Sequence, residues 1–108
     1  MKWSLLLLLI VFLVAGCDGR PTELERTASS LKLGMNKGEV KQLFADFHLS
    51  GETNAVFEIQ SATKFYSTNK QCSSMIVYGS KHLLSLEMCA IYFDTNDVVI
   101  AHYYNLND

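Results

Sequence analysis

An uncharged stretch at the start of the chain limits what the rest can fold into. Lys2 is followed by fourteen mostly apolar residues, 3–16, none of which is charged. A helix needs about 20 residues at 1.5 Å each to cross about 30 Å of hydrocarbon, so this stretch is too short for a stable membrane span. A cation, a short apolar run and small residues, in that order, are typical of a secretory signal peptide. We therefore expect residues 1–16 to be removed after export.

The apolar stretch ends at a cysteine. Val14, Ala15 and Gly16 precede Cys17, a sequence that resembles the lipobox of bacterial lipoproteins. The resemblance implies that the Cys17 thiol receives a diacylglyceryl group and becomes the first residue of the mature chain. Each buried methylene contributes about 0.8 kcal/mol, so several acyl chains would hold the protein at the membrane. The alternative is an ordinary cleaved signal peptide followed by an unmodified cysteine.

The mature chain is long enough for one small domain. Residues 17–22 include Gly19 and the only proline, so we expect a lipidated tether there, followed by a domain over residues 23–108. The signal peptide holds one cation, which leaves eight cations, eleven carboxylates and a net charge of −3 in the mature chain. The cations form no cluster, so nucleic-acid binding is not expected.

Two cysteines remain once Cys17 is modified. An exported domain can oxidise Cys72 and Cys89, and two thiols are enough for one bridge. A hairpin centred on residues 80–81 would place them directly opposite each other, with Cβ atoms about 4.5–5.5 Å apart. The sequence therefore predicts a Cys72–Cys89 disulfide. Two buried free thiols are the alternative, and no metal site is expected because no Cys/His pair has ligand spacing.

Two helices are predicted at the start of the domain. Residues 22–33 carry apolar residues at helical spacing, and residues 36–47 follow with a clear start signal. Asn36 can cap the second helix, with Glu39 in the position of a capping box. The buried stripe of this helix is expected to be Val40, Leu43, Phe44 and Phe47.

After Gly51 the apolar pattern changes to an alternating one. Residues 55–66 predict one long strand or two short ones, and residues 72–89 predict the cysteine hairpin. A last hairpin is expected around residues 94–97, with Phe93 opposite Val98. The predicted fold is α+β, with two N-terminal helices packed on one face of a four-stranded antiparallel meander.

Residues 31–44, LKLGMNKGEVKQLF, resemble the signature of the SmpA/OmlA (BamE-like) bacterial lipoproteins, and residues 91–104 resemble the last hairpin of that family. The resemblance implies the helix-pair and meander fold that this family shares with β-lactamase-inhibitor proteins. It also implies a lipid-anchored, non-enzymatic domain in the periplasm that contacts envelope proteins or lipid. Residues 47–52 lack the Gly-x-Pro turn of the family, so that loop cannot be transferred.

The residue after the lipidated cysteine bears on the choice of membrane. It is Asp18, and in enterobacteria-like lipoprotein sorting an aspartate at this position disfavours transfer to the outer membrane. The resemblance to such lipoproteins therefore favours the inner membrane, facing the periplasm, with the outer membrane as the alternative.

Both faces of the last two predicted strands are apolar. In an antiparallel sheet with one face in water, the face in contact with water should be polar. Exposed apolar patches usually mark contact surfaces, so one face is expected to bind a partner. The expected partner-binding residues are Leu86, Met88, Tyr92, Val99 and Tyr103. The alternative is a bulge that reverses the alternation midway, or an N-terminal segment folded over that face.

No catalytic arrangement is evident. His48, His82 and His102 are far apart in sequence, and no Ser/His/Asp or paired-carboxylate pattern accompanies them. We expect no enzyme and no cofactor. The expected function is a binding or scaffold module for cell-envelope proteins, in envelope or outer-membrane assembly, and the alternative is an anchored inhibitor or immunity protein that binds a periplasmic enzyme.

Overall fold

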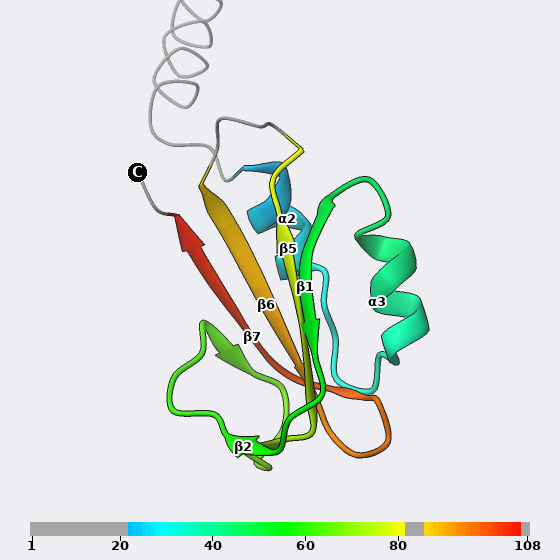
Figure 1. The fold of residues 1–108 in the computed structure, drawn as a ribbon, viewed down its shortest axis with the longest axis vertical. Coiled ribbons are helices and arrows are strands. Elements are labelled where there is room, and N and C mark those ends of the chain that lie inside the picture. Colours follow the sequence, from blue (N-terminus) through cyan, green and yellow to red (C-terminus); the bar gives the residue numbers. More distant parts are fainter. Residues whose placement is uncertain (1–21, 82–85, 107–108) are drawn as a thin grey trace, which may run out of the picture.

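The computed structural model describes residues 22–81 and 86–106, which form two short helices and two antiparallel sheets (Figure 1). The elements are α2 (Glu23–Ser29), α3 (Lys37–Leu43), β1 (His48–Thr53), β2 (Phe57–Glu58), β3 (Lys64–Phe65), β4 (Gln71–Cys72), β5 (Ser74–Gly79), β6 (Glu87–Phe93) and β7 (Val99–Leu106). The main sheet has the strand order β1-β5-β6-β7-β3, and β2 pairs with β4 in a second, two-stranded sheet. Within the described ranges no helix has the length and apolar character needed to cross a membrane.

Both helices start at side-chain caps. The Thr22 hydroxyl accepts a hydrogen bond from the Glu25 amide at 3.2 Å, and the Asn36 side-chain oxygen accepts one from the Glu39 amide at 2.8 Å. These bonds satisfy amides that have no partner within the first turn of a helix. The predicted cap at Asn36 is therefore confirmed.

The two helices pack against one face of the main sheet, which we call the helix face. Leu24 and Ala28 of α2 are buried there, as are Val40 and Phe44 at α3. The Phe44 ring stacks on Tyr78 with centroids 4.8 Å apart, which joins the end of α3 to β5. This main core consists of Leu24, Ala28, Leu31, Val40, Phe44, Ile76, Tyr78, Cys89, Ile91, Phe93 and Val99.

The turn between β6 and β7 holds the start of α3 in place. The Lys37 amide donates to the Asp97 carbonyl at 2.9 Å, and the Lys37 ammonium lies 3.1 Å from the Asp97 carboxylate. On the other side of the cap, the Val99 amide donates to the Met35 carbonyl at 2.9 Å. The predicted turn at residues 94–97 is present, with the Asp94 carboxylate accepting from two amides of the turn. Local capping and long-range pairing thus stabilise the same junction.

The α+β class and the two helices agree with the sequence analysis, but the four-stranded meander is wrong. The main sheet has five strands, and its strand order is not sequential because β1 pairs with β5 at one edge and β3 pairs with β7 at the other. Strand β1 had no alternating pattern to predict it, because five of its six residues are exposed and the sixth is half-buried. Between β1 and β5, residues 57–72 form the short strands β2, β3 and β4, of which β3 joins the main sheet and the other two form the second sheet.

The connection between the helices gives a test of the backbone. Gly34 has φ +90°, a left-handed conformation, and a Cβ at this position would meet no atom within 4 Å. Gly34→Ala should therefore destabilise the domain through backbone strain alone, by about 1–2 kcal/mol. Gly51 in β1 has equally open space and no positive φ, so Gly51→Ala should be neutral or stabilising. Urea denaturation of both variants measures the difference, and equal free energies of unfolding would contradict the assigned Gly34 conformation.

Candidate interaction surface

The face of the main sheet turned away from the helices, which we call the outer face, contains the predicted partner-binding surface. Cross-strand neighbours form three rows over β5, β6 and β7. The rows are Gly79–Met88–Asn105, Val77–Ala90–Tyr103 and Met75–Tyr92–Ala101. The third row lies nearest the β6–β7 turn, and the first lies at the opposite end of the sheet.

Residues 57–72 cover the part of the outer face near the β6–β7 turn. Ile59 and Cys72 pack there against Ile100 and Ala101 and form a second buried cluster. Tyr92 is half-buried beneath this segment, and the Phe57 ring meets it edge-on with centroids 5.9 Å apart. This half of the outer face is therefore core and is not available to a partner.

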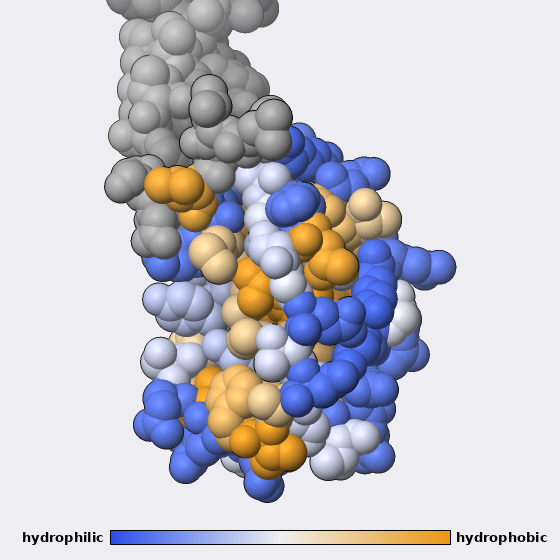
Figure 2. Space-filling view, viewed as in Figure 1, coloured by the Kyte–Doolittle hydropathy of each residue, from blue (hydrophilic) through white to orange (hydrophobic). Residues whose placement is uncertain are grey.

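The other half of the outer face is open. Met88 is 43% exposed and Tyr103 is 38% exposed, and Val77 and Ala90, in the same row as Tyr103, are half-buried. Figure 2 shows apolar atoms in a broken band down the middle of this side of the molecule. We call Val77, Met88, Ala90 and Tyr103 the outer patch. Leu86, at the end of this patch just before β6, is 61% exposed.

Two predicted surface residues lie elsewhere, and a bulge explains why. Phe93 pairs with Val99 but Tyr92 pairs with Ala101, so β7 contains one extra residue between these pairs. An extra residue reverses the alternation on one strand. Val99 therefore points to the helix face and is fully buried in the main core, whereas Tyr92 remains on the outer face under Phe57. The predicted Phe93–Val98 pairing is wrong, and the alternative of a bulge midway is correct.

The predicted Cys72–Cys89 disulfide is also wrong. Both cysteines are free and buried. Cys89 pairs with Tyr78 and lies in the main core, whereas Cys72 pairs with Phe57 and lies in the second cluster on the outer face. The connection between β5 and β6 begins after Gly79 and ends before Glu87, longer than the two-residue turn that the disulfide required.

Burial should make both thiols unreactive. It raises the pKa of Cys89 to about 12 and raises that of Cys72 above its ordinary value, and the thiolate is the reactive form. A thiol reagent should therefore modify Cys72 and Cys89 only after denaturation, and a reducing agent should leave the melting temperature unchanged. Mass spectrometry of the domain labelled with and without denaturant measures this. A mass two hydrogens lower, restored by reduction, would contradict free thiols.

A half-buried tyrosine and a buried histidine meet at the β3 edge of the helix face. The Tyr66 hydroxyl and His102 Nδ1 are 2.8 Å apart, and His102 is only 5% exposed. Burial raises the pKa of Tyr66 to about 12, so the phenol keeps its proton and can donate it in the hydrogen bond to a neutral imidazole. Burial, with a smaller contribution from Lys64, lowers the pKa of His102 below its ordinary 6.5. This hydrogen-bonded pair packs against the main core, with His102 buried and Tyr66 half-buried.

The low pKa of His102 makes stability depend on pH. Just below pH 6.5 the unfolded chain binds a proton at this histidine that the folded chain does not, so the free energy of unfolding falls as pH falls from 6.5 toward the folded-state pKa. His102→Gln should reduce the loss of stability between about pH 7.5 and about pH 5.5. His48→Gln, on an exposed position of β1, is the control for replacing a histidine as such. Chemical denaturation at both pH values measures it, and identical losses in all three proteins would contradict the role of His102.

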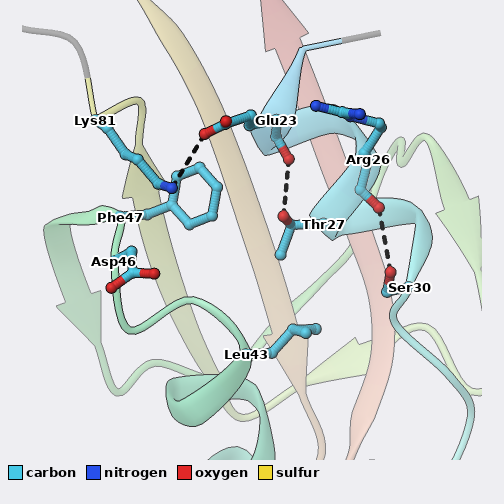
Figure 3. A pocket seen from close by; sticks show the side chains of 8 residues that line it. All are labelled: Glu23, Arg26, Thr27, Ser30, Leu43, Asp46, Phe47 and Lys81. Carbon is cyan, nitrogen blue, oxygen red and sulfur yellow. Dashed lines mark hydrogen bonds and ion pairs between the residues drawn. The ribbon is translucent and has the colours of Figure 1, made fainter.

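Sequence reasoning missed a groove between α2, the segment after α3 and the end of β5 (Figure 3). It has a volume of about 400 Å³ and is lined by Glu23, Arg26, Thr27, Ser30, Leu43, Asp46, Phe47 and Lys81. The Lys81 ammonium lies 3.0 Å from the Glu23 carboxylate and 5.1 Å from the centre of the Phe47 ring. The Thr27 and Ser30 hydroxyls donate to carbonyls of α2, which leaves them poorly placed as nucleophiles. Residues from three separate segments line this groove, so no local motif could have predicted it.

The described residues give no sign of a metal centre, since no three His, Cys, Asp or Glu side chains gather in a way that could hold an ion. Cys17, the signal peptide and residues 17–21 of the tether lie outside the described residues, as does His82. No protein-family model, curated protein or solved structure matches this chain. Among the described residues, the outer patch, with Met88 and Tyr103 exposed, is the candidate contact surface.

Proposed function

We propose that this protein is a lipid-anchored, non-enzymatic binding module of the bacterial cell envelope, and that it binds another envelope protein through the outer patch. The signal-peptide pattern and the lipobox-like residues before Cys17 support export and anchoring. The resemblance of residues 31–44 to the SmpA/OmlA lipoproteins supports a role in the envelope. Asp18, directly after the proposed anchor, favours the inner membrane, with the outer membrane as the alternative.

The observation that carries the proposal is the incomplete cover of the outer face. Residues 57–72 bury the half near the β6–β7 turn, but over the other half Met88 and Tyr103 remain exposed. Met88 pairs with Asn105 and Ala90 pairs with Tyr103, so the two large side chains are diagonal neighbours on one face, a distance that long side chains can bridge. Contiguous exposed apolar side chains on a sheet are typical of contact surfaces, and Tyr is enriched among residues that contribute most to binding.

The alternative of an anchored enzyme inhibitor has less support than the sequence suggested. It depended on a four-stranded meander shared with β-lactamase inhibitors and on a disulfide. The sheet has five strands in a non-sequential order, and the two cysteines are free. The absent meander counts equally against the fold implied for both candidates, but the disulfide supported the inhibitor alone, so the binding module is preferred.

The partner surface can be tested in intact bacterial cells. Met88→Ser combined with Tyr103→Ser should abolish the capture of partner proteins by crosslinking, because it removes both large exposed side chains of the outer patch. Both positions are partly exposed, so the melting temperature should change little. Leu33→Ser, at an exposed leucine between α2 and α3, is the matched control and should leave capture intact. Mass spectrometry of the crosslinked proteins gives the readout, and unchanged capture by the double variant would contradict the proposal.

A further inference from the structure

One end of the domain gathers the start of α2, the end of β5 and the start of β6 (Figure 1). Thr22, Lys81 and Glu87 line a single hollow there. The Thr22 hydroxyl also lies 3.2 Å from the Tyr104 hydroxyl of β7, near the end of that strand. We call this the tether end, because the described part of the chain begins at Thr22.

The length of the chain before Thr22 limits how far the tether end can be from a lipidated Cys17. Thr22 is five residue steps after Cys17, and a fully extended chain spans at most about 3.6 Å per step, or about 18 Å in all. Strand β6 alone has seven residues and extends about 23 Å at 3.3 Å per residue. The β6–β7 turn at the far end of that strand is therefore farther from the anchor than the tether end is.

The tether end carries an exposed leucine where contact with lipid is expected. Leu86 is 61% exposed, and the next residue, Glu87, lines the same hollow as Thr22. Lys81 at this end is paired with Glu23 at 3.0 Å, so its charge is already compensated within the domain. An exposed apolar side chain beside a compensated cation suits the boundary between headgroups and acyl chains better than it suits recognition of anionic lipids.

We propose that Leu86 inserts into the surface of the bilayer and that the domain therefore stands on its tether end, with residues 57–72 and the β6–β7 turn pointing away from the membrane. This inference rests on the proposed lipid anchor at Cys17. It names the bilayer as the occupant of the Leu86 surface, and it leaves Met88 and Tyr103 of the outer patch to the protein partner.

The sequence allows a clean fluorescence test. The only tryptophan, Trp3, belongs to the signal peptide, so a mature chain has no background tryptophan emission. Leu86→Trp and Val56→Trp replace two exposed apolar residues, 61% and 67% exposed, one at the tether end and one in the segment before β2 that leads into the far half. Each full-length variant is produced with its signal peptide, purified from the membrane fraction of the cells and reconstituted into phosphatidylcholine vesicles with and without brominated acyl chains.

The expected result is a blue-shifted emission from Trp at position 86 that brominated lipid quenches and that raised salt leaves unchanged, with no quenching at position 56. Quenching at neither position or at both would overturn the proposed orientation, and loss of quenching in raised salt would show an electrostatic contact in place of an inserted leucine. The mass of the same samples separates the two proposals. An acylated Cys17 without quenching at position 86 refutes only the orientation, whereas an uncleaved chain with an unmodified Cys17 refutes the anchor and the orientation together.

Discussion

The β-bulge in β7 is the constraint on which the rest of the structure depends. Without it, Val99 and Ala101 would lie on the same face of the sheet, and one of the two buried clusters would lose a member. With it, Val99 completes the main core beneath the helices, while Ile100 and Ala101 support the segment that covers the outer face. The Val99 amide also bonds to the Met35 carbonyl, so the bulge lies next to the junction where α3 begins. One extra residue in β7 thus allows both buried clusters to form, and it lies next to the hydrogen bond that joins β7 to the residue before the α3 cap.

The same bulge explains why the outer face is divided. Toward the β6–β7 turn, the residues after the bulge provide an apolar platform for Ile59 and Cys72, and the chain returns to the sheet edge to form β3. That edge pairing ends at His102, and the Thr63 hydroxyl then accepts a hydrogen bond from the Tyr104 amide at 2.7 Å. Beyond this point no described segment crosses the outer face, and Met88 and Tyr103 stay exposed. The open half results from where the covering segment ends.

The local parts of the fold could be predicted from the sequence because local signals determine them. The Asn36 cap and the burial of Val40 and Phe44 follow from a capping residue and a helical period. Pairing was harder to predict. Moving the β5–β6 register by an even number of residues leaves every side chain on its own face, so alternation could not distinguish the predicted pairing from the observed one. The disulfide hypothesis failed because the loop is longer and because Cys72 lies in β4, in the second cluster, whereas Cys89 lies in the main core.

The candidate site was predicted in part for similar reasons. Met88 and Tyr103 lie on regular stretches of β6 and β7, where alternation assigns the face correctly. Residues 98–101 are all apolar, so they show no alternation of apolar and polar residues that would assign each side chain to a face of the sheet. The bulge and the burial of Val99 could therefore not be predicted from these residues. The groove in Figure 3 was missed because residues from separate segments line it. The edge strand β1 was missed because five of its six residues are exposed.

The two proposals together restrict the kind of partner. Met88 lies two residues after Leu86, a separation of about 7 Å along a strand. If Leu86 is in the surface of the bilayer, the Met88 side of the outer patch lies just above the headgroups and faces sideways. Tyr103 is level with Ala90, four residues or about 13 Å after Leu86, so a partner that covers both Tyr103 and Met88 must itself extend to within about 7 Å of the membrane. That geometry suits a partner embedded in, or anchored to, the same membrane and disfavours one that diffuses freely in the periplasm, because only the former presents its surface at that height at all times.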